Sequence, residues 1–150
     1  MNSLRDKYGI VGVGETEYSR HSGRTTRAMA VEAIRRAILD AGLGAGDVDG
    51  MMSYQNNDST PSNWVAADLG IRLNFYMDVL GGGSSTEALV GLAMGAIEAG
   101  MCRTVALFRS MNGYSELRIG GTGARAAAPV RGLDLAQRPF GMTSAGQRSP

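Results

Sequence analysis

Apolar residues gather in one stretch of the chain in the order expected for strand, turn, helix and strand. They fill Phe75 to Leu80 and again Val105 to Phe108, and a helix-length apolar segment from Ser84 to Ala99 lies between these two runs. Short apolar runs bounded by turn residues are typical of buried strands. The pattern therefore predicts a βαβ unit, with the turn Gly81-Gly82-Gly83 before its helix.

The central helix of this unit lacks a polar face. Its only charges are Glu87 near its start and Glu98 near its end, and a helix that is apolar all round is buried on all sides. Gly91 and Gly95 lie four residues apart, and each costs about 1 kcal/mol relative to alanine. We therefore expect another element to pack closely against that face. At about 1.5 Å per residue, this helix is shorter than a typical membrane span, and strands flank it on both sides. We therefore interpret it as a core helix.

Upstream, the pattern predicts a strand and an amphipathic helix. The apolar run Tyr8 to Val13 is expected to form a first buried strand. From Thr26 to Ala41, apolar residues recur at intervals of three and four, as on a surface helix. Glu32 and Arg36 are spaced for an ion pair on its outer face, and Gly42 is expected just past its end.

Two further elements complete the alternation of strands and helices. Gly50 to Gln55 is expected to form a second strand parallel to the first, and Trp64 to Leu69 a short helix ending near Gly70. This alternation predicts an α/β domain with a mainly parallel sheet over residues 1–110. Residues 111–150 show no sustained period and are expected to form a loop region. Cover for the apolar central helix should come from another domain or subunit.

Composition narrows the classes of function. The formal net charge of +1 comes without a basic cluster, so no nucleic-acid partner is expected. A single cysteine excludes an intramolecular disulfide, and no segment resembles a signal peptide or membrane span, so we expect a cytoplasmic protein. With only one histidine, the chain offers no obvious cluster for a zinc or iron site, and we expect it to hold no cofactor of its own.

The glycine turn is the first candidate for chemistry. The N-terminus of the following helix directs free N–H groups and a positive dipole end at the turn, which suits an anionic or carbonyl oxygen. Ser84 or Ser85 is expected to cap this helix. The alternative is that the turn has no chemical role and only leads into a structural helix. Asp78 is a charge inside an apolar strand, and an edge or interface position would explain it without chemistry.

Other motifs point less clearly to chemistry. Gly12 and Gly14 follow the first strand, but Glu17 stands where a dinucleotide motif needs its third glycine. Cys102 follows the end of the central helix, remote from an N-terminus that would lower its pKa, and we interpret it as structural. A serine nucleophile at Ser84 or Ser85 would need a base. Only His21, on a distant loop, is available for that role.

Four segments together carry a family likeness. They are IVGVGETEYSR near the start, DAGL with its following DVDG, GGGSSTEALVGLAMGAIEAG, and RPFGMTSAGQRSP near the end. In this order they resemble the thiolase superfamily, and in particular its sterol-carrier-protein-x and lipid-transfer-protein branch. The resemblance covers nearly all of this chain, which corresponds to only about the N-terminal half of a family member.

The resemblance implies a layered αβαβα fold built from two similar halves, with the central helix buried between two sheets. It also implies a homodimer formed through Phe75 to Leu80. Members of this branch act on acyl-CoA thioesters and commonly work with a small OB-fold, zinc-ribbon partner protein. The expected ligand is therefore an acyl-CoA substrate.

One departure from the family pattern changes the expected chemistry. The nucleophilic cysteine of thiolases falls on Gly83 here, so no acyl-enzyme can form at that position. The glycine pair after the next strand is also replaced, by Phe108-Arg109. The chain thus resembles the aldolases of the branch, which cleave a β-hydroxyacyl-CoA, often from a steroid side chain.

The resemblance assigns roles to the glycine turn. Gly83 and Ser84 are expected to contact the oxyanion or thioester, and Gly82, Ser85 and Asn112 are expected to contact substrate. The base, a tyrosine or histidine in family members, would come from the C-terminal half. Two alternatives remain: a thiolase or acyltransferase that uses a cysteine elsewhere, and a non-catalytic acyl-CoA- or lipid-binding subunit.

Overall fold

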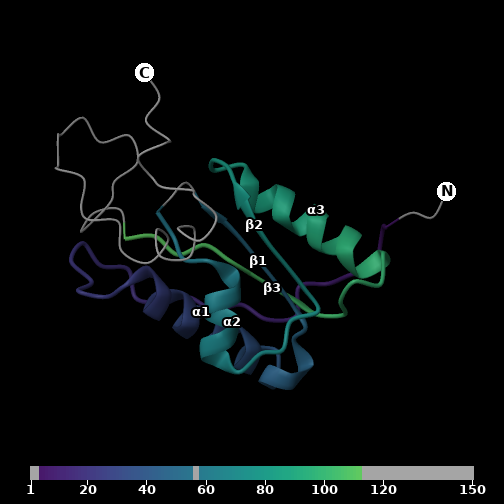
Figure 1. Ribbon diagram of the computed structural model, residues 1–150, viewed down its shortest axis with the longest axis horizontal. Helices are drawn as coiled ribbons and strands as arrows, with labels where there is room; N and C mark the ends of the chain where they lie inside the picture. Colours follow the sequence, from purple (N-terminus) through teal and green to yellow (C-terminus); the bar gives the residue numbers. More distant parts are fainter. Residues whose placement is uncertain (1–3, 56–57, 113–150) are drawn as a thin grey trace, which may run out of the picture.

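The structure is a computed structural model that describes residues 4–55 and 58–112 (Figure 1). Strands and helices alternate along this part of the chain, as the sequence predicts. The elements run in the order α1 (Thr26–Asp40), the 3-10 turn η1 (Ala45–Asp47), β1 (Gly50–Gln55), α2 (Ser62–Leu69), β2 (Phe75–Leu80), α3 (Ser85–Glu98) and β3 (Val105–Phe108).

The three strands form one parallel sheet in the order β2-β1-β3. Gly50, the first residue of β1, lies opposite Phe75 of β2 on one side and Val105 of β3 on the other. The first four residues of β1 are buried, as expected for a central strand covered on both faces. This in-register pairing brings the carboxyl ends of all three strands to the same edge of the sheet, and it confirms the predicted parallel sheet.

Helices cover both faces of this sheet (Figure 1). Successive side chains of a strand point to opposite faces, and the two adjacent methionines of β1 show this directly. Met51 packs in a core with α1 and α2, whereas Met52 packs in a second core with α3, and neither side chain is exposed. The described residues therefore form three layers, with α1 and α2 on one face and α3 on the other.

The amphipathic helix α1 begins at the predicted residue, ends one residue before the predicted Ala41, and carries the predicted surface pair. The Thr25 hydroxyl caps it by accepting a hydrogen bond from the Ala28 N–H at 3.1 Å. Gly42, just past its end, adopts the left-handed conformation with φ +68° that favours glycine. The predicted pair between Glu32 and Arg36 is present at 2.5 Å.

The prediction of a buried strand at Tyr8 to Val13 is wrong. No strand forms there, and Ile10, Val11 and Val13 are 80, 66 and 71% exposed. A strand needs a hydrogen-bonded neighbour, and among the described residues no strand pairs with this segment. β1 accordingly lies parallel to β2 and β3 rather than to the N-terminal segment.

Instead, the N-terminal segment lies against α1. A Cβ added at Gly12 would lie 2.2 Å from the Ala37 carbonyl oxygen, and one at Gly14 would lie 2.2 Å from the Ala33 carbonyl oxygen. Such short distances show that the two glycines allow the backbone of the segment to approach the helix closely.

The outer face of α3 is exposed, so the prediction that this helix is buried on all sides does not hold for the described residues. Leu89 is buried against the sheet, but Val90 and Leu92 are 36 and 44% exposed. A Cβ added at Gly91 or Gly95 would meet no atom within 4 Å. A single sheet can cover only one side of a helix, so the cover expected from another domain or subunit stays a prediction.

Candidate active site

The glycine turn, residues Gly81 to Ser84, lies where the carboxyl ends of the parallel strands meet. In open α/β sheets this edge is where ligands commonly bind. The turn follows β2 directly and leads into α3. The N–H of Gly81 donates to the carbonyl oxygen of Gln55, the last residue of β1, at 3.2 Å. The central strand therefore fixes the start of the turn.

The glycines of the turn have different physical explanations. A Cβ added at Gly81 would lie 2.0 Å from the Ser85 hydroxyl oxygen, so a side chain at this position would force that hydroxyl to turn away. Gly82 and Gly83 are exposed, and a Cβ at either would meet no atom within 4 Å. Packing among the described residues would therefore allow a side chain at Gly83, and it does not explain why glycine stands there.

α3 begins immediately after Gly83 and Ser84. Ser84 occupies the N-cap position, as the sequence predicts for Ser84 or Ser85, but its side chain makes no capping hydrogen bond. The Ser85 N–H donates to the Gly82 carbonyl oxygen at 3.0 Å, and the Ser85 side chain is buried. Orphan N–H groups and the dipole of the 14-residue helix give this end a positive potential. An oxyanion would be stabilised there.

Asp78 of β2 has a structural explanation. Its carboxylate accepts a hydrogen bond from the Ser53 hydroxyl at 2.5 Å and from the Ser62 N–H at 3.1 Å. Ser62 is the first residue of α2, whose N-cap residue, Pro61, makes no side-chain cap. Asp78 therefore caps α2 from the neighbouring strand. Since β2 lies at the edge of the sheet, this agrees with the interpretation of Asp78 without chemistry.

A partly buried ion pair lies at the end of β3. The Arg109 guanidinium pairs with Asp58 and stacks over the Tyr54 ring, 4.6 Å from its centroid. The Asp58 side chain is 1% exposed and that of Arg109 is 18% exposed. From the sequence, Arg109 stands out only because it replaces a glycine of the family pattern, and its pair with Asp58 is not predicted. The positions of Asp58 after β1 and of Arg109 after β3 could have indicated this pair, because parallel strands bring their carboxyl ends together.

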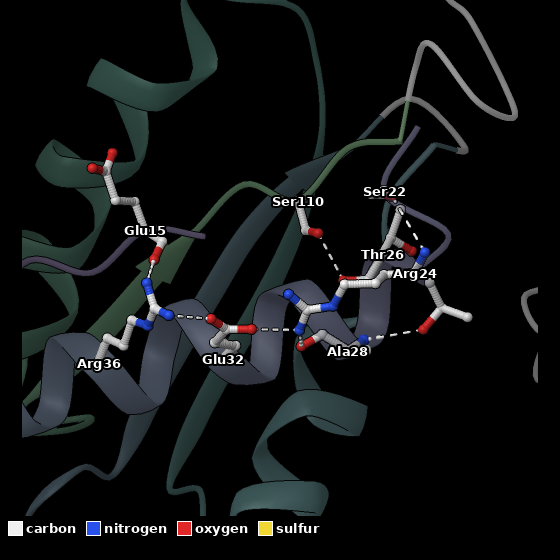
Figure 2. Close-up of polar contacts among 9 residues, drawn as sticks. Glu15, Ser22, Arg24, Thr26, Ala28, Glu32, Arg36 and Ser110 are labelled. Atoms are coloured by element: carbon white, nitrogen blue, oxygen red, sulfur yellow. Dashed lines mark hydrogen bonds and ion pairs between the residues drawn. The ribbon is translucent and has the colours of Figure 1, made fainter. Parts of the chain in front are cut away.

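Asn112 is held on the α1 side of the sheet. Its side-chain amide donates to the Arg24 carbonyl oxygen at 2.7 Å and accepts from the Ser22 hydroxyl at 3.2 Å. Nearby, the Ser110 hydroxyl donates to the Thr26 carbonyl oxygen at 2.7 Å (Figure 2). Both side-chain groups of Asn112 thus fix the chain after β3 to the start of α1, and contact with substrate stays a prediction.

A polar network along α1 extends from this anchor (Figure 2). Glu32 pairs with Arg24 and Arg36, each at 2.5 Å, and the Arg36 guanidinium donates to the Glu15 carbonyl oxygen at 2.8 Å. The hydrogen bond from Arg24 is the main interaction that lowers the pKa of Glu32. The network thus holds the N-terminal segment on α1, and none of its contacts involves the glycine turn.

The candidate nucleophile and base lie in different surroundings. Cys102 is buried, and burial followed by the negative charge of Asp49 raises the pKa of its thiol, as expected for a structural cysteine. His21 lies on an exposed loop.

Within residues 4–55 and 58–112, no three His, Cys, Asp or Glu side chains lie close enough together to form a metal site. The helices formed by these residues are too short or too polar to cross a membrane.

Comparison with curated proteins finds relatives over most of the chain. The chain is 34% identical over 152 residues to the steroid side-chain-cleaving aldolase of Thermomonospora curvata, an alignment covering 98% of this chain and 38% of that protein. It is 36% identical over 118 residues to the 17-hydroxy-3-oxo-4-pregnene-20-carboxyl-CoA lyase of Mycobacterium tuberculosis, covering 78% and 30%. No family model matches the chain.

Solved structures with the same fold agree with these relatives. The Ltp2-ChsH2(DUF35) aldolase superposes with a TM-score of 0.66 and 32% sequence identity over 92% of this chain and 34% of that one. A monomeric SCP2-thiolase-like protein type 1 from Mycobacterium smegmatis gives a TM-score of 0.56 and 26% identity over 65% and 22%.

The fold is thus that of the thiolase-like α/β proteins. Within this class the chain belongs to the lipid-transfer branch, which the ordered sequence motifs predict. The chain spans less than two-fifths of the length of the curated relatives that it matches.

Proposed function

We propose that the full-length protein is a carbon–carbon lyase that cleaves a β-hydroxyacyl-CoA by a retro-aldol reaction. The observation that carries this proposal is the side-chain-free Gly83 at the open N-terminal end of α3. In the thiolase pattern, a cysteine nucleophile would stand there. Retro-aldol cleavage needs no such nucleophile, because it forms no covalent bond to the enzyme.

The reaction balances without an external oxidant or reductant. A base removes the proton of the β-hydroxyl group, the bond between Cα and Cβ breaks, and Cβ becomes the carbon of a ketone. The electron pair of that bond passes to the thioester as an enolate, which takes up a proton at Cα to give a shortened acyl-CoA. The base is expected from a tyrosine or histidine of the C-terminal half.

This chain would supply the enolate contact. Backbone N–H groups fixed at a helix N-terminus stabilise a developing oxyanion without reorganising. We assign the thioester oxygen to the region of Gly83 and Ser84, with Gly82 and Ser85 beside it. The chain itself is expected to hold no cofactor, and coenzyme A enters as part of the substrate.

The names of two relatives support a steroid substrate. One relative is a steroid side-chain-cleaving aldolase, and the other is a lyase of a 17-hydroxy, 20-carboxyl-CoA steroid. That second name describes a hydroxyl group on the carbon β to the thioester, which is the arrangement that a retro-aldol step requires. We therefore propose a steroid-derived β-hydroxyacyl-CoA as the substrate class.

Two partners are proposed. The Ltp2 aldolase was solved together with ChsH2, a DUF35 protein, which supports a similar small OB-fold, zinc-ribbon partner here. A homodimer through β2 is supported by the edge position of this strand and by Tyr76 and Leu80, which are 54 and 66% exposed. A cytoplasmic location is part of the same proposal.

The test is cleavage by the full-length protein with its small partner, using steroid and straight-chain β-hydroxyacyl-CoA substrates. We expect equal amounts of ketone and shortened acyl-CoA, with no acylated protein. Absence of cleavage would favour a non-catalytic acyl-CoA-binding subunit, and an acylated cysteine would favour an acyltransferase.

A further inference from the structure

We infer that Arg109, together with Asp58 and Tyr54, is a positioning residue for the glycine turn. This inference goes beyond the proposed function, which concerns the turn itself, and rests on it only where activity is measured. We call the three side chains the Arg109 clamp.

The clamp joins the end of β3 to the end of β1. The guanidinium of Arg109 donates to the carbonyl oxygen of Tyr54 at 3.3 Å and covers the ring of the same residue at 4.6 Å. It also pairs with Asp58, which lies in the segment between β1 and α2. One cation thus holds the backbone and the side chain of β1 near its final residue.

From there a single residue leads to the turn. Gln55 follows Tyr54, and its carbonyl oxygen accepts the hydrogen bond from the Gly81 N–H at 3.2 Å. The Tyr54 ring also packs against the core formed with α3, which begins beside the turn. Any shift of Tyr54 would therefore move the anchor of Gly81 and part of the packing beneath α3.

Burial makes the clamp specific to arginine. A buried charge needs a partner, and Asp58, whose side chain is 1% exposed, is paired with Arg109, which also donates to the carbonyl oxygens of Tyr54 and Ser110. Lysine could keep the charge but not the planar fork or the stacking on the ring. Arg109→Lys therefore separates geometry from charge.

The chain contains a matched control for this test. Arg27 pairs with Asp68 through two hydrogen bonds of 2.6 Å and lies over the Trp64 ring at 5.3 Å. It makes the same kinds of contact as the clamp, although its side chain is more exposed, at 45%. It joins α1 to α2, and the structure records no contact between Arg27 and β1 or the glycine turn. Arg27→Lys should thus cost stability without disturbing Gly81.

The experiment measures hydrogen exchange of the Gly81 to Ser85 amides in the full-length protein with its partner. We expect exchange at least several-fold faster than wild type in Arg109→Lys and unchanged exchange in Arg27→Lys. Tyr54→Leu should reproduce the effect and Tyr54→Phe should not, which keeps the test decisive if Arg109→Lys fails to fold. Equal exchange at the turn in Arg109→Lys and Arg27→Lys, or wild-type exchange in Tyr54→Leu, would overturn the inference.

Activity gives an independent readout. If the protein cleaves a β-hydroxyacyl-CoA, Arg109→Lys should lower kcat at least ten-fold with a smaller change in KM, because small misplacements of reacting groups carry large rate penalties. Arg27→Lys should leave kcat within two-fold of wild type. Equal kcat in both variants would contradict positioning. If wild type cleaves no substrate, the proposed function fails, while the exchange measurement still decides the role of the clamp.

Discussion

The carboxylate of Asp78 on β2 caps the N-terminus of α2 by accepting the hydrogen bond of the Ser62 N–H through both of its oxygens, each at 3.1 Å. Because Ser53 of β1 also donates to this carboxylate, one side chain joins two strands and a helix. A charge in an apolar strand is thereby explained without a catalytic role.

Replacing Asp78 by alanine should destabilise the fold. The variant loses a helix cap and leaves the Ser53 hydroxyl, which is 0% exposed, without this partner. Together these losses should lower the free energy of unfolding by about 2–3 kcal/mol. Urea denaturation of wild type and variant measures the difference. The exposed Asp6→Asn serves as a control that should change stability little, and an equal effect of both substitutions would refute the capping role.

Asp49 should make the stability of the fold depend on pH in the acidic range. Burial alone would raise the pKa of Asp49, but hydrogen bonds from the Thr104 and Arg103 N–H groups and from Asn74 outweigh burial and lower it. A lowered folded-state pKa contributes stability that is present above the unfolded value of 3.8 and is lost as the pH falls through the folded value.

Wild type should therefore lose more stability between pH 5 and pH 3 than Asp49→Asn, whose side chain does not titrate. Urea midpoints at both pH values test this. A parallel fall in the two proteins would show that Asp49 does not contribute to the pH dependence.

Gly81 and Gly83 should respond differently to alanine. A Cβ at Gly81 would displace the Ser85 hydroxyl and lie 3.2 Å from the Ser85 Cβ, so Gly81→Ala should destabilise the protein by about 1 kcal/mol. Gly83→Ala meets open space and should change stability by less than about 0.5 kcal/mol. If the full-length protein acts as proposed, however, Gly83→Ala should lower kcat/KM at least ten-fold, since the added methyl group would occupy the proposed thioester position. Wild-type kcat/KM in Gly83→Ala would remove Gly83 from the site.

The exposed face of α3 should cause the 150-residue segment to associate when it is produced alone. Val90 and Leu92 are partly exposed on a helix with few charges. Changing both to lysine should shift the sedimentation of the segment toward the monomer. Leu39→Lys changes an apolar side chain on α1 that is 68% exposed and should not have this effect. Equal behaviour of these variants would show that α3 is not the associating surface.

For the residues that the structure describes, the sequence predicts the three strands and three α-helices well because each carries its own periodic pattern and its own end signals, as Gly42 shows. It fails at Tyr8 to Val13, where the apolar pattern is that of a strand but strand formation depends on a neighbour that the described residues do not provide. The glycine turn could be located from sequence because it lies between two strong patterns.

Charged residues that follow β1 and β3 were a sequence signal, but local patterns alone could not assemble the Arg109 clamp. Asp58 and Arg109 are 51 residues apart, and their pairing depends on the strand order β2-β1-β3 rather than on any local pattern. Likewise, the role of Asp78 becomes visible only when α2 is seen to begin beside β2.

Mass spectrometry of the full-length protein during turnover of a steroid β-hydroxyacyl-CoA tests the central mechanism most directly. Retro-aldol cleavage at a turn without a thiol predicts a ketone and a shortened acyl-CoA in equal amounts, while the protein mass stays unchanged throughout. A protein carrying an acyl group, on Cys102 or on any other cysteine, would contradict this mechanism.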